Sequence, residues 1–186
     1  MNISLPDHTK RLILRTSDES EAADVLDFYQ RNSSDIEKTE PISFRDFYTL
    51  RFHRTVLKTE RTMIERGQML RFWLYLSSDP KKLIGTISFH NIRRGDFSDA
   101  SVGYKIDSSF RRKGYCREAL LTGIDFMMSD LCIHRLYAYV LPDNAPSINL
   151  LTSLGFVREG LLRNNIRIAG QFKSHYIYSL IQEDLL

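Results

Sequence analysis

The chain has 186 residues, 42% of them hydrophobic and 26% charged, which suits a folded globular domain and excludes a disordered chain. A formal net charge of +3 is too small to indicate nucleic-acid binding, although it allows an anionic small ligand. The two cysteines, Cys116 and Cys132, have neither metal-ligand nor disulfide-framework spacing, so we expect no metal and a reducing, cytoplasmic location.

The first half of the chain predicts three strands and two helices. The N-terminal segment has no apolar leader and no run is long enough to span a bilayer, so we expect no signal peptide and no membrane partner. In chain order we expect a strand at residues 11–15, then a helix that follows the capping box Thr16–Glu19 and runs to about Arg31, and then a loop at 32–41. A long helix should follow, from a cap at Ser43–Asp46 to about Arg66, and Gly67 should end it. After it we expect a strand at 69–76, a turn at 80–82 and a strand at 83–90.

The second half predicts further strands and two more helices. We expect a turn at residues 93–96, a strand at 100–106, a helix at 114–129, a strand at 134–141, a helix at 145–154, and strands at 156–161 and 172–181. No repeat or linker interrupts this order. The pattern indicates one domain over residues 1–186, of the α/β or α+β class, with a mixed sheet.

A basic, glycine-marked turn joins the strand at 100–106 to the helix at 114–129. It reads SSFRRKGYCREALL over residues 108–121, with three cations before the glycine. The start of a helix has unpaired N–H groups and the positive end of the dipole, and glycine lets the backbone approach a phosphate. The turn therefore suits either a phosphate-bearing ligand or a solvated charge run that caps the helix, and the absence of P-loop and dinucleotide motifs excludes those two nucleotide-binding classes.

Several motifs resemble one enzyme family. The hexapeptide at 111–116 (RRKGYC) resembles the R-x-x-G-x-[GA] acetyl-coenzyme A loop of the GNAT acetyltransferases, with Cys where Gly or Ala is usual. The downstream motifs are HRL at 134–136, NAPS at 144–147, LGF at 154–156 and EG at 159–160. Their order and spacing are similar to the RimJ/RimL-type branch, and the likeness covers nearly the whole chain. It implies the GNAT fold, a mixed and mostly antiparallel sheet of about seven strands, splayed in the middle and flanked by about four helices.

The resemblance also implies a binding site for acetyl-CoA. The splayed strands would take the pantetheine arm like an added strand, bonded by the backbone of Tyr104, Lys105 and Ile106. The pyrophosphate would lie on backbone N–H groups of Arg111, Arg112, Lys113, Gly114, Tyr115 and Cys116, and the side chains of Arg112 and Lys113 would reach the 3′-phosphate. Asn144 resembles the asparagine that contacts coenzyme A, and is also a favoured N-cap. Ser147 resembles a serine that contacts the cofactor and donates to the leaving thiolate.

The general base is not given by the motifs. The Glu that the branch places after Gly160 is missing here, and the strand position where other branches have Glu is Tyr139. His90, Tyr139 and ordered water are the alternatives, since imidazole has a suitable pKa and a lone His is also often structural. We interpret His175 as a packing residue because its strand neighbours are apolar, and Cys116 as one because the family transfers directly, without an acyl-enzyme. A structural role is the expectation for Glu118.

The resemblance implies direct transfer of an acetyl group from acetyl-CoA to a primary amine. We expect a protein N-terminal α-amine, such as that of a ribosomal protein. The alternatives are a small amine (polyamine, amino acid or antibiotic) and a coenzyme-A-binding module with little catalysis. Asp35, Glu37 and Glu40 form an acidic loop that would attract a cationic amine or face solvent. A basic patch at Arg163, Arg167 and Lys173 would face ribosomal RNA or nothing; we expect no direct nucleic-acid binding, and a monomer or homodimer.

Overall fold

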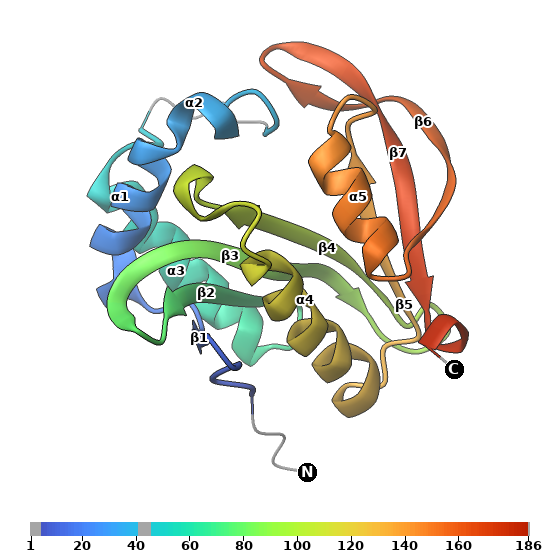
Figure 1. Ribbon diagram of the computed structural model, residues 1–186, viewed down its shortest axis with the longest axis horizontal. Helices are drawn as coiled ribbons and strands as arrows, with labels where there is room; N and C mark the ends of the chain where they lie inside the picture. The colour runs from blue at the N-terminus through green and yellow to red at the C-terminus, as the bar shows by residue number, and fades with distance from the viewer. Residues whose placement is uncertain (1–4, 41–45, 186) are drawn as a thin grey trace.

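A seven-stranded sheet in the order β1-β2-β3-β4-β5-β7-β6 forms the centre of the computed structural model, which describes residues 5–40 and 46–185 (Figure 1). The strands are β1 (Leu12–Arg15), β2 (Leu70–Leu76), β3 (Asp79–Arg93), β4 (Asp99–Ile106), β5 (Arg135–Val140), β6 (Val157–Ile168) and β7 (Gln171–Ile181). Neighbouring strands are antiparallel except β4 and β5, which are parallel. The predicted mixed, mostly antiparallel sheet is confirmed.

Helices cover both faces of the sheet. They are η1 (Glu19–Glu21), α1 (Ala22–Arg31), α2 (Ser33–Ile36), α3 (Leu50–Glu65), η2 (Ser108–Phe110), α4 (Tyr115–Asp125), the π-helical η3 (Phe126–Asp130), α5 (Ala145–Ser153) and η4 (Gln182–Leu185). Helices α1 and α3 lie on one side of the sheet and α4 and α5 on the other (Figure 1). The four longer helices are the ones that the sequence predicts.

Alternation along β2 assigns its side chains to two separate cores. Phe72 and Leu74 belong to the cluster that α4 and α5 cover, whereas Trp73 and Tyr75 belong to the cluster under α1 and α3. Successive side chains of a strand point to opposite faces, so a strand buried on both sides is apolar throughout. Trp73 is only 2% exposed, which confirms that the aromatic segment at 69–76 is a core strand.

The sheet opens between its two central strands. The β4–β5 pairing covers three residue pairs, from Asp99–Arg135 to Ser101–Tyr137. Beyond Ser101, β4 continues to Ile106 with β3 as its paired neighbour, and β5 continues to Val140 beside β7. Figure 1 shows the two strands diverging towards α2 and the β6–β7 hairpin. The predicted splay in the middle of the sheet is therefore confirmed.

The N-terminal elements begin later than the sequence predicts. Asp18, rather than Thr16, caps the first helical turn by accepting a hydrogen bond from Ser20 N, because Asp is as good a cap as Thr. The predicted loop at 32–41 contains the short helix α2. Helix α3 begins at Leu50 behind the cap of Thr49. The cap predicted at 43–45 lies outside the described residues.

Three other boundaries differ from the prediction. The β2–β3 hairpin turns at residues 77–78 instead of 80–82, and Pro80 lies near the start of β3, where proline is tolerated. The helix predicted at 114–129 ends its α-helical part at Asp125 and continues as a π-turn. Strand β6 extends to Ile168, beyond the predicted residue 161, because β7 supplies backbone partners to its end.

Candidate active site

The basic turn ends β4 and begins α4 in a left-handed conformation. Gly114 is the N-cap of α4 with φ of 80°, and Arg112 has φ of 59°. A Cβ at Gly114 would lie 3.3 Å from Nη2 of Arg11, so a larger residue there would be both strained and crowded. No side chain of the described residues caps the helix, so the N–H groups of its first turn are left for an anion.

Two of the three cations in this turn lack a carboxylate partner. Arg111 is paired, with Nη2 at 2.9 Å from Oδ2 of Asp35 in α2. Lys113 lies over the ring of Phe110, with Nζ 5.0 Å from the centroid. Within residues 5–40 and 46–185, neither Arg112 nor Lys113 forms an ion pair, and both are exposed. These two charges are the ones available to a phosphate.

The carboxylate of Glu118, in the first turn of α4, anchors the basic turn through hydrogen bonds from Thr9 and Arg11. Its Oε2 lies 2.6 Å from Nε of Arg11, and its Oε1 accepts from Thr9 Oγ1 at 2.5 Å. Burial opposes ionisation of Glu118, but the hydrogen bonds from Thr9 and Arg11 outweigh it and lower its pKa. Arg11 also donates to the carbonyl of Lys113 at 2.9 Å. Glu118 therefore has the structural role expected, through a partner that no local motif indicates.

A second polar cluster fixes the end of β4 onto α1. Asp107 caps η2 by accepting from Ser109 N at 2.9 Å, and its Oδ2 lies 2.9 Å from Nε of Arg31. Asn32 accepts from Ser108 N at 3.1 Å and is buried, as is Asp107. The turn is thus anchored on both sides before any ligand binds. Neither Asn32 nor Asp107 was predicted as a site residue, although Asp107 before two serines is a usual cap pattern.

The start of α5 meets β4 across the opening in the sheet. Asn144 caps α5 by accepting from Ser147 N at 3.2 Å, and its amide nitrogen makes no hydrogen bond within the described part of the chain. The Ser147 hydroxyl lies 2.6 Å from the Tyr104 hydroxyl. Burial raises the pKa of Tyr104, so its phenol stays protonated at neutral pH. The structure therefore brings together Asn144, Ser147 and Tyr104, and leaves one amide free.

The next residue along β4 points to the opposite face. Nζ of Lys105 lies 2.8 Å from Oε1 of Glu40 and 5.8 Å from the centroid of the Tyr29 ring. His90 shares this face, since it pairs with Ser101 in register and Thr86 pairs with Lys105. Burial, Arg71 and Lys105 lower the pKa of His90 to about 4, so this imidazole is neutral at pH 7 and a weak proton acceptor.

Tyr139 lies on the same face of the sheet as His90, but Tyr139 is on β5 and His90 on β3, and β4 lies between these two strands. It is 40% exposed on β5, and its ring centroid is 5.5 Å from that of Tyr137. The alternate residues of β5, such as Ala138, point into the core. The structure gives no direct hydrogen bond between Tyr139 and His90 among the described residues.

Three other titratable side chains, those of Glu159, His175 and Cys116, are either hydrogen-bonded within the protein or kept protonated by burial. Glu159 accepts from Arg135 Nη1 at 2.8 Å and from Ser179 at 2.6 Å, and these bonds lower its pKa to about 2. His175 is buried with Nδ1 2.8 Å from Oδ1 of Asn165, consistent with packing. Burial raises the pKa of the Cys116 thiol to about 12, which keeps it protonated.

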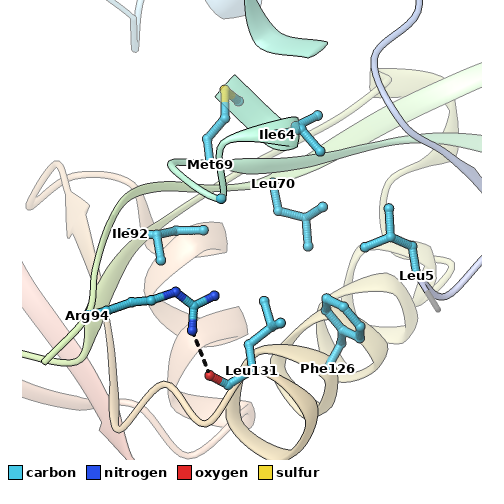
Figure 2. Close-up of a pocket in the computed structure, with 9 residues that line it drawn as sticks. Leu5, Ile64, Met69, Leu70, Ile92, Arg94, Phe126 and Leu131 are labelled. Carbon is cyan, nitrogen blue, oxygen red and sulfur yellow. Dashed lines mark hydrogen bonds between the residues drawn. The ribbon is translucent and has the colours of Figure 1, made fainter. Parts of the chain in front are cut away.

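The hollow shown in Figure 2 lies away from this site. It has a volume of about 130 Å³ and is mostly apolar, with Ile64, Met69 and Ile92 among its lining residues (Figure 2). Ile92 is near the end of β3 that pairs with the beginning of β4, whereas the basic turn follows the end of β4. Among the described residues no helix is long and apolar enough to cross a membrane, and no three acidic, His or Cys side chains could together hold a metal.

Comparisons with known proteins agree with one another. The profile of the acetyltransferase (GNAT) domain matches residues 11–157. The [Ribosomal protein uS5]-alanine N-acetyltransferase of Escherichia coli is 30% identical over 176 residues, which is 95% of this chain and 90% of that protein. The structure of ribosomal-protein-S5-alanine acetyltransferase from Vibrio fischeri has a TM-score of 0.88 at 29% identity, over 98% of both chains. In fold, RimJ of Mycobacterium smegmatis in complex with CoA-disulfide is similar too, with a TM-score of 0.85 at 24% identity over 98% of this chain and 92% of that one.

Proposed function

Because the chain belongs to the acetyltransferase (GNAT) family, in its RimJ/RimL-type branch, we propose that it transfers an acetyl group from acetyl-CoA directly to the α-amine of a protein N-terminus. The observation that carries this proposal is the opening between β4 and β5 beside a helix start where Arg112 and Lys113 have no carboxylate partner among the described residues. The ribosomal-protein acceptor is supported by the activity named for the Escherichia coli relative.

The residues present fit acetyl-CoA. The backbone of Tyr104, Lys105 and Ile106 is paired with β3 on one side, and its other edge is where a pantetheine arm would lie as an added strand. The backbone N–H groups at 111–116 and the side chains of Arg112 and Lys113 would hold the phosphates. The free amide of Asn144 would donate to the same arm while its oxygen caps α5.

The hydroxyl pair on α5 and β4 suits the leaving sulfur. Bound acetyl-CoA supplies an acetyl thioester, whose C–S bond breaks as the amine N–C bond forms and one proton passes from nitrogen to sulfur. Ser147 would donate its proton towards the sulfur and take one from Tyr104, whose hydroxyl is 2.6 Å away and would be reprotonated by water. The raised pKa of Tyr104 keeps the phenol a donor throughout the neutral range.

The amine needs little help from a base. An N-terminal α-amine has a pKa of about 7.7–8.0, so a sizeable fraction is already neutral at physiological pH. His90 and Tyr139 face the side from which the amine would arrive and would pass its proton to water. Because the pKa of His90 is about 4, a proton taken up by its imidazole would pass quickly to water at neutral pH.

Thiol release from acetyl-CoA tests the proposal. Purified protein is assayed with peptides that begin with Ala or Ser, with the same peptides blocked at the N-terminus, and with polyamines, amino acids and aminoglycosides. We expect release that requires the free α-amine of a peptide. Release with small amines alone would replace the acceptor class. Tight acetyl-CoA binding without release for any amine would instead support a coenzyme-A-binding module.

A further inference from the structure

Glu40 and the ring of Tyr29 form a cup that already holds a primary ammonium. We propose that this cup is the binding site for the acceptor's ammonium group, and that the side chain of Lys105 occupies it in the free protein. The inference rests on the proposed function and names the group that the sequence motifs do not supply, a carboxylate on the acceptor side. Its ligand class is a peptide with a single N-terminal ammonium.

The cup has the chemistry of an ammonium site. Nζ of Lys105 lies 2.8 Å from Oε1 of Glu40 and 5.8 Å from the centroid of Tyr29. The two side chains that form the ion pair are 18% and 32% exposed, so the contact is sheltered but reachable from solvent. A carboxylate and an aromatic face together bind a cation by charge and by the ring quadrupole. Burial disfavours charged Lys105, but Tyr29 and Glu40 outweigh it and raise its pKa.

The position of the cup matches the acceptor side of the reaction. Tyr104 and Lys105 are successive residues of β4, so their side chains leave the strand on opposite faces at the same point. Tyr104 reaches Ser147 on the α5 side, where the leaving sulfur would lie. Lys105 reaches Glu40 on the α1 side. An ammonium held in the cup would therefore lie on the side of the opening opposite the proton donor, and it would lose one proton to water before the neutral amine attacks.

The charges around the cup favour one ammonium over several. Arg71 shares this face and is matched by Glu60, with Nε 2.9 Å from Oε1. His90 is neutral at pH 7 because of its lowered pKa. Within residues 5–40 and 46–185, the ion-pair partner of Glu40 is Lys105, and a polyamine would bring extra positive charge towards Lys105 and Arg71, whose carboxylate partners are already paired. A peptide N-terminus brings one ammonium that can replace Lys105.

A structural role for the same ion pair predicts different results. If the pair only ties the α2 loop to β4, then removing either partner breaks the same contact and weakens the site alike. If Glu40 binds the acceptor and Lys105 competes for it, then Glu40→Gln removes the ligand of the ammonium whereas Lys105→Met removes its competitor. The two substitutions then change peptide affinity in opposite directions.

The test measures equilibrium binding of an Ala-initiated peptide to the CoA-loaded protein by calorimetry, so that it does not depend on turnover. We expect Glu40→Gln to weaken peptide binding about tenfold, as for loss of a hydrogen bond to a charged group. Lys105→Met is expected to tighten it about threefold and to improve spermidine binding by a larger factor. The matched control is Glu65→Gln on α3, where the exposed carboxylate pairs with Arg61; it should leave peptide binding unchanged.

Weaker binding in both variants, or unchanged binding in both, would overturn the inference. Coenzyme A affinity is measured for each variant, so that a change in cofactor binding is separated from a change in peptide binding. If wild-type protein binds the peptide in the expected way but never releases thiol, the proposed function fails while the ammonium site stands. If thiol is released and the two variants behave alike, the site assignment fails while the proposed function stands.

Discussion

The cationic side chains on the two sides of β4 differ in whether they are paired with carboxylates. On the α4 side, Arg112 and Lys113 have no carboxylate partner within the described chain, and the helix start beside them has no side-chain cap. On the α1 side, Lys105 is paired with Glu40 and Arg71 with Glu60. Unpaired cations beside free N–H groups suit a polyanion, whereas a neutralised face suits a group of small net charge. In the proposed reaction, β4 would therefore separate a phosphate-rich donor from an amine acceptor.

The largest expected effect comes from changing the phosphate side. Gly114→Asp places a Cβ and a negative charge at a left-handed helix start, 3.3 Å from Arg11. We expect acetyl-CoA binding to weaken about 100-fold, from the strain of this conformation and the repulsion of phosphate. Calorimetric titration with acetyl-CoA measures it.

A matched variant separates strain from binding. Gly95→Asp introduces the same side chain at φ of 71°, in a turn where no heavy atom of the described residues lies within 4 Å of the added Cβ. It should leave acetyl-CoA affinity unchanged. Equal loss of affinity in both variants would mean that the effect is one of folding, and the assignment of the turn would be wrong.

The second expected effect is on the chemical step. Ser147→Ala removes the hydroxyl that lies 2.6 Å from the Tyr104 hydroxyl, and we expect kcat to fall about tenfold, as for loss of one hydrogen bond to a developing charge. Tyr104→Phe should cost less, and the double variant should be no worse than Ser147→Ala, because the two hydroxyls act as a pair. The control is Ser153→Ala on the same helix, where the hydroxyl donates to Leu150 O. Additive losses would contradict a paired donor.

A smaller effect sharpens the contrast between paired and unpaired cations. Arg112→Gln and Lys113→Gln should each weaken acetyl-CoA binding about threefold at low salt, and the difference should fade at 1 M salt, where screening is strong. The control is Arg66→Gln, which removes an exposed cation at the C-terminal end of α3 and should leave acetyl-CoA affinity unchanged. Salt-independent losses would indicate that the two side chains pack rather than attract phosphate. Titrations at two salt concentrations measure this.

The smallest effect concerns protonation of the acceptor face. The pKa of His90 falls from 6.5 in an unfolded chain to about 4, so between these values the unfolded state binds more protons. Stability therefore falls as the pH drops from about 6.5 to about 4, and His90→Gln should reduce this loss. Urea unfolding at pH 7.5 and pH 5 measures it. The kcat/KM profile between pH 6 and 8 should keep its shape in the same variant; loss of a limb there would make His90 the base.

Local pattern predicted most elements but not the contacts between them. The order of strands and helices, the basic turn and the capping role of Asn144 follow from periodicity and cap chemistry, which act over a few residues. The hairpin turn lies at 77–78, whereas the sequence predicted it at 80–82, because proline is common in turns. Proline is also tolerated near the start of a strand, which is where Pro80 lies. The splay of the sheet came from family resemblance, and the structure confirms it.

The partners of the site residues could not be read from spacing. Arg11 meets Glu118, Tyr104 meets Ser147 and Lys105 meets Glu40 only after distant segments pack together. The sequence places Glu40 in an acidic loop, and the family pattern predicts a carboxylate after Gly160 that this chain lacks. Only the fold shows that this loop lies against the end of β4, because sequence separation says nothing about which elements are neighbours.

The most direct measurement gives the protein one molecule with two kinds of amine. A peptide that begins with Ala and contains an internal Lys is incubated with acetyl-CoA and the protein, and tandem mass spectrometry locates the acetyl group. The α1 side of β4, where Glu40 and Glu60 are each paired with one cation, lies opposite an open phosphate site, so we expect a single acetyl group on the α-amine, in a product that forms only with the protein. Acetylation of the Lys side chain alone, or of added spermidine in preference to the peptide, would contradict the account.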